Sequence, residues 1–443
     1  MNKKMRRMVT LSLSAAFTCL PIASWAQTSD IDSGLAEMFR LAEQHNATLH
    51  TLQSSLLEAR AGIETAKTAR LPEVSASLSF SYLGNARIWN RHFGEGTKAE
   101  MPHYGNNFLL KASQVIYAGG AIDGSIRLAE QNAEMKGLAI EEEVQKVRFL
   151  LTGLYLQLHS LKNAQEVYNT NGALAEEMIA LMRKRREQGV ALRNDITRYE
   201  LQLQEMQLGA TTMSDRQSIV RKQLATALGT DSVSVRLLGE QAFDDSQIRM
   251  ETEEMWQQRA LANHKGLQQS VLSIDISRTK ETLEKAERLP KVALVAENHL
   301  DGPITIEVPP INKNLNYWFV GVGVSYNFSS LYKNKRNIRQ AELATSMAAD
   351  RLTEAKAGVS DAIHAAYVNF GTARTELDTR KKSVQLAAEN YDVVRKRYEN
   401  GMAIVTDLTD AANMKLDAEL ALVNARINLV YAFYNLKYAA GCL

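Results

Sequence analysis

The stretch Val74–Tyr82, VSASLSFSY, alternates apolar residues and serines without interruption. Because successive side chains of a β-strand point to opposite faces, it predicts a strand with one apolar face and one hydroxyl face. A protein core and a lipid bilayer can both cover an apolar face of this kind. The rest of the sequence has to decide between these two environments.

The first 26 residues indicate the destination of the chain. Four basic residues precede a short apolar run, Met8–Leu20, and the small residues Ser24 and Ala26 mark a cleavage site. This order is typical of a secretory signal peptide, and the run is shorter than the roughly 20 residues of a membrane-spanning helix. Cys19 follows Phe17-Thr18, which matches a lipid-attachment motif poorly. We therefore predict a signal peptide at 1–26.

Charge and cysteine content exclude several classes of protein. Without the four basic residues of the signal peptide, 48 Lys and Arg stand against 50 Asp and Glu, a net charge of −2. That balance predicts no nucleic-acid partner. One cysteine remains, Cys442, so we expect neither an internal disulfide nor a cysteine metal cluster. No apolar stretch of spanning length remains, which argues against a helical membrane protein.

Proline separates helical from extended regions. The seven prolines lie at 21, 72, 102, 290, 303, 309 and 310. Proline inside a helix costs about 3 kcal/mol, so the proline-free spans 103–289 and 311–443 predict long helices. The remaining prolines bracket two strand regions, near 72–117 and 290–328. A heptad of apolar residues over 363–398 further predicts helices that supercoil around one another.

The chain contains an internal duplication. Residues 113–229 align with 325–441 at a constant offset of 212, which places Arg183-Lys-Arg185 on Arg395-Lys-Arg397. Arg70-Leu-Pro72 aligns with Arg288-Leu-Pro290 at an offset of 218. A period of this kind means that one structural unit occurs twice.

The duplication defines the predicted domains. The first repeat, 27–229, comprises a helix, a β-hairpin near 72–117, a long helix over 119–188 and a helix over 191–229. The second repeat, 253–443, comprises a helix, a β-hairpin near 290–328, a long helix over 331–400 and a helix over 403–441. Residues 230–252 are an equatorial connector between the two repeats.

The strand predicted over Tyr317–Phe328 favours lipid as the cover of the apolar faces. Its apolar face carries aromatic residues at both ends and valines between them, as in strands of membrane barrels. We assign to the lipid-facing girdle Trp318, Tyr326, Phe328, Phe80 and Tyr82. Four strands cannot close a barrel, so a membrane sheet requires oligomerisation. A soluble four-stranded sheet on a helical bundle is the alternative, which the signal peptide and girdle residues disfavour.

These features together resemble the TolC family of outer-membrane efflux and secretion channels. The resemblance rests on the duplication, the two hairpins between long helices, the turn Tyr398–Asp410 and the ending Tyr434–Gly441. It implies a mainly α fold with membrane β: a homotrimer with a twelve-stranded outer-membrane β-barrel, four strands from each chain, and a long α-helical tube in the periplasm.

The implied function is that of a passive exit duct in a tripartite efflux or type I secretion system. The implied partners are a periplasmic adaptor, or membrane fusion protein, an inner-membrane pump of the RND or ABC type, and outer-membrane lipid. The implied location is the cell outer membrane with an extension into the periplasm.

The resemblance also implies where the tube closes. Asp407 and Asp410 match acidic residues that point into the narrow entrance, and their spacing places them on one helix face. A threefold axis would repeat them as two stacked carboxylate rings that favour cations. Tyr398 matches a tyrosine that ties the inner helix pair to the neighbouring pair, and Asp195 matches its partner. This chain has Ala403 where the family often has a basic residue, so part of the closing network is missing or replaced.

Local sequence offers a simpler interpretation of these residues. Asp195 and Asp407 stand at the starts of helices, where an aspartate caps free N–H groups, and the sequence alone favours capping over gating. The glycines before them are ordinary helix ends. The resemblance makes the tips the docking surface for the adaptor, with Gly189, Val190, Gly401 and Met402 as candidates.

We expect no catalytic site, no metal site and no cofactor. The eight histidines show no metal-ligand spacing, and Gly321-Val-Gly323 lies inside a strand, so it is not a nucleotide-binding loop. A periplasmic adaptor or structural coiled-coil protein is the alternative function. Adaptors, however, carry one helical hairpin flanked by soluble β-domains, whereas this sequence predicts two hairpins interrupted symmetrically by strands.

Overall fold

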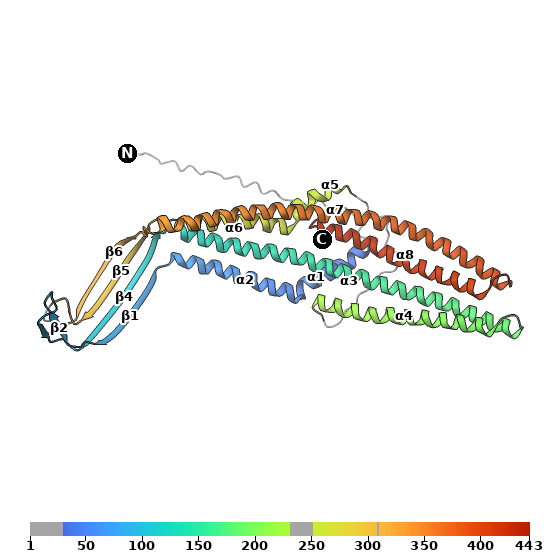
Figure 1. The fold of residues 1–443 in the computed structure, drawn as a ribbon, viewed down its shortest axis with the longest axis horizontal. Coiled ribbons are helices and arrows are strands. Elements are labelled where there is room, and N and C mark those ends of the chain that lie inside the picture. Colours follow the sequence, from blue (N-terminus) through green and yellow to red (C-terminus); the bar gives the residue numbers. More distant parts are fainter. Residues whose placement is uncertain (1–29, 231–250, 308–309) are drawn as a thin grey trace, which may run out of the picture.

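A computed structural model describes residues 30–230, 251–307 and 310–443. The predicted signal peptide and nearly all of the predicted connector lie outside these residues. The described part is a long rod with a β-sheet at one end (Figure 1). Its helices are α1 (Asp30–His45), α2 (Ala47–Lys67), α3 (Ala121–Glu187), α4 (Arg193–Leu228), α5 (Glu253–Asn263), α6 (Lys265–Ala286), α7 (Ser330–Glu399) and α8 (Val405–Ala439). Its strands are β1 (Glu73–Tyr82), β2 (Ala86–Trp89), β3 (Gly96–Ala99), β4 (Tyr104–Tyr117), β5 (Lys291–Gly302) and β6 (Leu315–Ser325).

Two helices, α3 and α7, run the length of the helical part. They contain 67 and 70 residues, which at 1.5 Å per residue is about 100 Å each. The shorter helices α2 and α4 lie end to end along α3, and α6 and α8 do the same along α7 (Figure 1). None of the described helices combines the length and apolarity needed to cross a membrane. The mainly α fold with a duplicated hairpin architecture is confirmed.

Each unit has a helix break that the sequence did not predict. Asn46 separates α1 from α2 with an extended backbone, and its side-chain oxygen accepts hydrogen bonds from the N–H groups of Thr48 and Leu49. His264 separates α5 from α6 at the equivalent position. The asparagine also donates to the carbonyl of Ala227 at 2.8 Å, so the break lies against the end of α4. Capping chemistry thus ends a helix where the apolar pattern continues.

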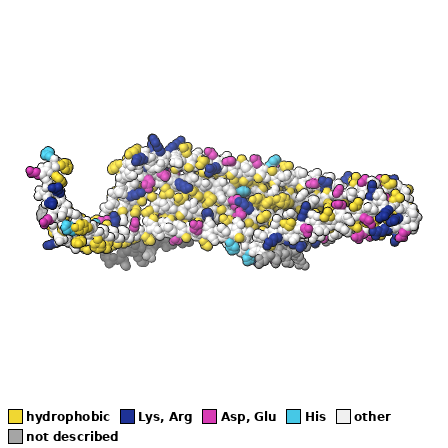
Figure 2. Space-filling view, turned by 60° about the horizontal axis from the view of Figure 1, so that its bottom comes forward, with side chains coloured by type: hydrophobic (Ala, Val, Ile, Leu, Met, Phe, Trp, Pro, Cys, Tyr) yellow, Lys and Arg dark blue, Asp and Glu magenta, His cyan; other side chains and the backbone are white. Residues whose placement is uncertain are grey.

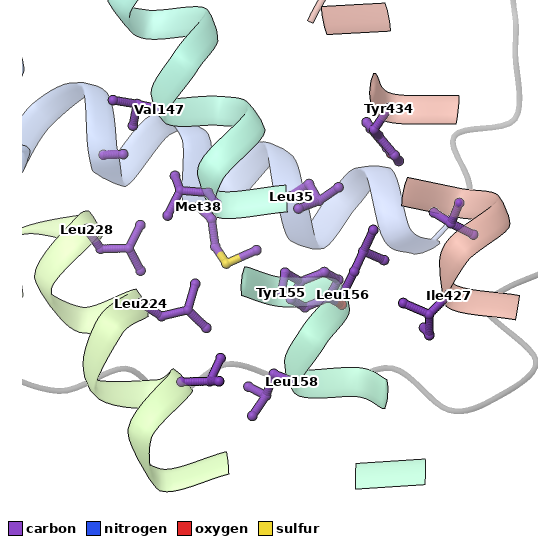
Figure 3. Close-up of a cluster of buried hydrophobic side chains, with 14 of the residues drawn as sticks. Leu35, Met38, Val147, Tyr155, Leu156, Leu158, Leu224, Leu228, Ile427 and Tyr434 are labelled. Carbon is purple, nitrogen blue, oxygen red and sulfur yellow. The ribbon is translucent and has the colours of Figure 1, made fainter. Parts of the chain in front are cut away.

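The core lies around these breaks in the middle of the rod. Figure 3 shows side chains from α1, α3, α4 and α8 converging there. The most deeply buried members include Leu35, Leu151, Tyr155, Leu158 and Leu224, all with exposed fractions of 1 % or less. The heptad face of α7 is buried as well: Ile363, Phe370 and Leu377 contact helices α5 and α8 through two further clusters. Packing within the second unit, and packing of α8 against α1, α3 and α4 of the first unit, therefore hold the helical part together.

The main sheet is antiparallel in the order β1-β4-β5-β6, which leaves β1 and β6 as open edges. Its register divides the sheet into two unlike faces. Phe80, Trp318 and the valines of β6 lie on one face with the other apolar residues of β1. Ser75 to Ser81 lie on the other face at alternate positions, with Lys111 of β4 and Glu297 of β5.

Every charged residue in these four strands lies on the serine face. These residues are Glu73, Lys111, Lys291, Glu297 and Asp301, and His299 lies with them. The opposite face exposes apolar side chains to 60 % or more, including Val74, Leu78, Phe80, Trp318, Val320 and Val324. A large apolar face that the chain itself leaves uncovered needs another apolar environment.

The structure corrects two details of the predicted strands. The region near 72–117 also contains β2 and β3, which form a separate two-stranded sheet beyond the main one. In addition, β6 ends at Ser325 and not at Phe328. Strand alternation therefore does not place Tyr326 and Phe328 on the apolar face that carries Trp318 and the valines of β6. Asn327 begins a turn there, with its side chain accepting from the N–H of Ser329. The two rings meet edge to face at the junction with α7, 4.9 Å between centroids.

Candidate functional site

The end of the rod farthest from the sheet is formed by two helical turns with the same geometry. Gly189 joins α3 to α4 with φ +76°, and Gly401 joins α7 to α8 with φ +72°. In each turn the glycine N–H donates to the carbonyl three residues earlier. Left-handed backbone of this kind favours glycine, because a side chain there is strained.

An aspartate caps the next helix at both tips. The carboxylate of Asp195 accepts a hydrogen bond from the N–H of Leu192, and that of Asp407 accepts from the N–H of Ile404, both at 3.4 Å. These contacts are the capping role that the sequence favoured, and a carboxylate also suits the positive end of a helix. Capping occupies one oxygen and leaves both aspartates at the surface.

Asp410 has no capping role in the structure. It lies one turn further along α8, it is exposed, and among the described residues it has no recorded hydrogen bond or ion pair. Asp407 and Asp410 are three residues apart on a helix and therefore share a face. Two exposed carboxylates lie close together at this tip.

The two hairpins contact each other through Arg185 and Tyr398. The guanidinium of Arg185 donates to the backbone carbonyls of Tyr398, at 2.9 Å, and Glu399, at 2.8 Å. It also lies over the Tyr398 ring, 5.4 Å from its centroid. Tyr398 is buried, and burial together with the nearby charge of Asp195 raises its pKa. The structure thus places Tyr398 near Asp195 within one chain, and Arg185 makes the direct polar contact.

Sequence reasoning missed two further contacts between the hairpins. Arg198 of α4 donates to the hydroxyl of Thr406 at 3.0 Å, and Gln202 donates to the side-chain oxygen of Asn413 at 2.9 Å. Aligning the repeats could have indicated the first, because Arg198 occupies the position that Asp410 has in the second repeat. A charge reversal between equivalent positions is a signal that the two sites differ in role.

Both tips expose apolar side chains beside a basic surface. Val190 and Leu192 are exposed on the first tip, and Met402 and Ile404 on the second, each to more than 60 %. Figure 2 shows Lys and Arg side chains gathered at this end of the rod. Between α3 and α4 lies an open cavity of about 680 Å³, lined by Arg183, Arg186, Arg193, Glu187, Ile196, Thr197 and Glu200.

Comparison with known proteins gives a consistent result. The family model described as outer membrane efflux protein matches residues 38–230 and 256–442. The outer membrane efflux protein BepC of Brucella suis is 21 % identical over 403 residues, 90 % of this chain and 83 % of that protein. The outer membrane protein TolC of Vibrio cholerae is 20 % identical, covering 99 % of this chain and 96 % of that protein. The crystal structure of the Campylobacter jejuni CmeC outer membrane channel is similar in fold, with a TM-score of 0.73, 16 % identity, and coverage of 94 % and 87 %.

Proposed function

The chain belongs to the outer membrane efflux protein family, and from that premise we propose how this channel is built, closed and docked. It is an outer-membrane channel of a tripartite efflux system and extends into the periplasm. Channels of this family are trimers that work with an adaptor and an inner-membrane pump, and they are not enzymes. The chain acts as a passive conduit for substrate delivered by the pump.

The division of the sheet into two faces carries this conclusion. A lysine facing lipid at the bilayer midplane costs about 2–4 kcal/mol, and an acidic residue there is unfavourable by a smaller amount. The face that holds every charge of the sheet therefore points into the barrel. The opposite face, with Phe80 and Trp318, contacts outer-membrane lipid. Open edges are not tolerated in lipid, and β6 of one copy pairs with β1 of the next. Three copies then close a barrel of twelve strands.

For the aromatic girdle we propose two positions. Phe80, Tyr82 and Trp318 lie toward the end of the sheet that is remote from the helices, where Tyr82 meets Tyr104 edge to face at 6.1 Å between centroids. Tyr326 and Phe328 lie at the end next to α7. Aromatic residues at both ends of a lipid-facing wall are typical of membrane barrels.

We place the periplasmic gate at the second tip. Asp407 and Asp410 of three chains form two carboxylate rings around the threefold axis, and Tyr398 with Asp195 lies between the two hairpins. The exposure of both carboxylates and their shared helix face support this placement. Arg185 and Arg198, which reach from the first hairpin to the second, supply the polar ties that a basic residue at position 403 would supply. Ala403 instead packs against the apolar core of the tip.

For the adaptor we propose docking at the two tips. Gly189 and Gly401 hold the turns, Val190 and Met402 offer apolar contacts, and the arginines around the nearby cavity suit acidic residues of a partner. The inner-membrane pump is of the RND or ABC type.

The assembly is tested by purifying the chain in detergent and measuring its mass and its conductance in a planar bilayer. We expect three copies per particle and discrete, cation-selective channels of small conductance. A folded monomer without channel activity would favour the alternative of an adaptor or structural coiled-coil protein, and would contradict the proposal.

A further inference from the structure

Four polar side chains form a cross-strand cluster on the serine face of the sheet, which holds all of its charged residues. Lys111 of β4 pairs with Glu297 of β5 at 3.0 Å between Nζ and a carboxylate oxygen. Nε2 of His299 lies 3.1 Å from Glu297, and its Nδ1 lies 3.7 Å from Asp301. The histidine therefore stands between two carboxylates that are four residues apart on its own strand.

The neighbouring strands hold the imidazole in place. Its ring stacks on that of Tyr317 of β6, with 4.6 Å between centroids and 2° between planes, and Phe319 lies at 6.3 Å. On the β4 side, Leu109 is the register partner of His299, and Asn107 donates to the carboxylate of Asp301. The side chains of His299 and Glu297 are 17 % and 15 % exposed, so the cluster is packed and still reachable from solvent.

We propose that the cluster of Lys111, Glu297, His299 and Asp301 is a pH-dependent charge ring in the barrel, which adds to the cation selectivity given by the carboxylate rings at the second tip. The inference rests on the proposed function, because only a closed trimer repeats the cluster around a lumen. With a neutral imidazole each chain contributes one positive and two negative charges; protonation of His299 adds a second positive charge. The ring of three therefore changes from a net charge of about −3 to about zero, which weakens its attraction for cations.

The chemistry of the cluster supports this role. A protonated imidazole donates from Nε2 to Glu297 at 3.1 Å and forms an ion pair with Asp301 across 3.7 Å, so both carboxylates favour its positive charge. The groups that face it are Glu297 and Asp301 on its own strand, Lys111 on β4 through Glu297, and Tyr317 on β6. Two acidic groups, Glu297 and Asp301, stand against one basic group, Lys111, so the cluster is negative while the imidazole is neutral.

The test is the reversal potential of single channels in a salt gradient, with the pH of each compartment set separately. We expect the cation-over-anion permeability ratio of the unaltered channel to fall about twofold or more when the extracellular side is changed from pH 8 to pH 5. His299→Asn should remove this response. His103→Asn should keep it, because His103 lies outside the cluster and stacks on Tyr82.

The other outcomes distinguish a failure of the charge ring from a failure of the channel itself. A full pH response in His299→Asn, or a response that follows only the periplasmic compartment, overturns the charge ring while leaving the channel intact. If His299→Asn fails to assemble, the side-specific acidification of the unaltered channel decides alone. If the unaltered chain forms no channel at all, the proposed function fails, and the inference fails with it.

Discussion

At the first hairpin tip Arg185 reaches across to the second hairpin, whereas its repeat equivalent, Arg397, donates to the carbonyl of Met402 within its own turn. The same contrast holds one turn beyond the caps, where the first repeat has Arg198 and the second has Asp410. The backbones nevertheless agree: both turns use a glycine with positive φ, and both helices begin with a capping aspartate. Both repeats therefore keep the glycine and the aspartate that the turn needs. The arginines that donate across the tip lie on the first hairpin, and the oxygens that accept from them lie on the second.

The two tips also bury apolar side chains of unequal size, and shortening the larger one should destabilise the tip more than any other change considered below. Tyr199 is 1 % exposed in the core of the tip, while Ala411 occupies its equivalent position in the second repeat. Tyr199→Ala leaves a cavity and should destabilise the tip by about 3–5 kcal/mol, measured as faster amide hydrogen exchange in α4 and α8.

Tyr199→Phe is the matched control. The buried hydroxyl of Tyr199 has no recorded hydrogen-bond partner among the described residues, so its removal should leave stability unchanged or slightly higher. A loss of stability as large as that of the alanine variant would show that the hydroxyl, and not the ring, holds the tip together.

A buried histidine distinguishes the first repeat from the second in the middle of the rod. His159 stands where the second repeat has Gly371; burial, with a smaller contribution from Lys162, lowers its pKa to about 4. The unfolded chain binds this proton below about pH 6.5, whereas the folded chain binds it only below about pH 4. The free energy of unfolding should therefore fall by about 3 kcal/mol as pH falls from about 6.5 to 4.

The measurement is the thermal midpoint at several pH values. His159→Gln should flatten the acid side of the profile, because it removes the group that the folded chain keeps neutral. His364→Gln is the control, since the side chain of His364 is 65 % exposed and pairs with Glu253 at the surface. Equal profiles for all three proteins would mean that His159 does not govern the acid response.

The arginine contrast should give a smaller effect. Arg185→Ala removes two hydrogen bonds from a charged donor to partly exposed carbonyls, so a local loss of about 1–2 kcal/mol is expected. Arg397→Ala removes one long contact, 3.4 Å, within its own turn and should cost less than about 0.5 kcal/mol. Hydrogen exchange at the tip amides of residues 398–402 compares the two variants directly. Equal effects would remove the distinction between the tips.

The sequence predicted the parts of the fold that repeat or alternate. Proline placement, the offset of 212 residues and the alternation in β1 were sufficient for the long helices, the duplication and the main sheet. The breaks at Asn46 and His264 were missed because a single residue with extended backbone interrupts a helix without changing the apolar pattern. The end of β6 was misplaced because alternation continues past Ser325 into the turn.

At the tip, sequence reasoning found the residues but not their contacts. The positions of Asp195, Asp407 and Tyr398 followed from the repeat and the resemblance. That Arg185 lies over Tyr398, and that Gln202 meets Asn413, depends on how two helices separated by about 200 residues pack together. The residues around each position in the sequence do not determine that packing, so these pairs can be identified only in the folded structure.

The proposed closure of the channel depends most on the carboxylate rings, and single-channel conductance tests them directly. Asp407→Asn with Asp410→Asn removes both charges while leaving an oxygen at 407 that can accept from the N–H of Ile404. Asp195→Asn makes the same change at the equivalent cap of the first repeat. We expect the double variant to conduct more and to lose most of its cation selectivity, while Asp195→Asn changes less. An unchanged conductance and selectivity in the double variant would contradict the gate and leave Asp407 as a helix cap.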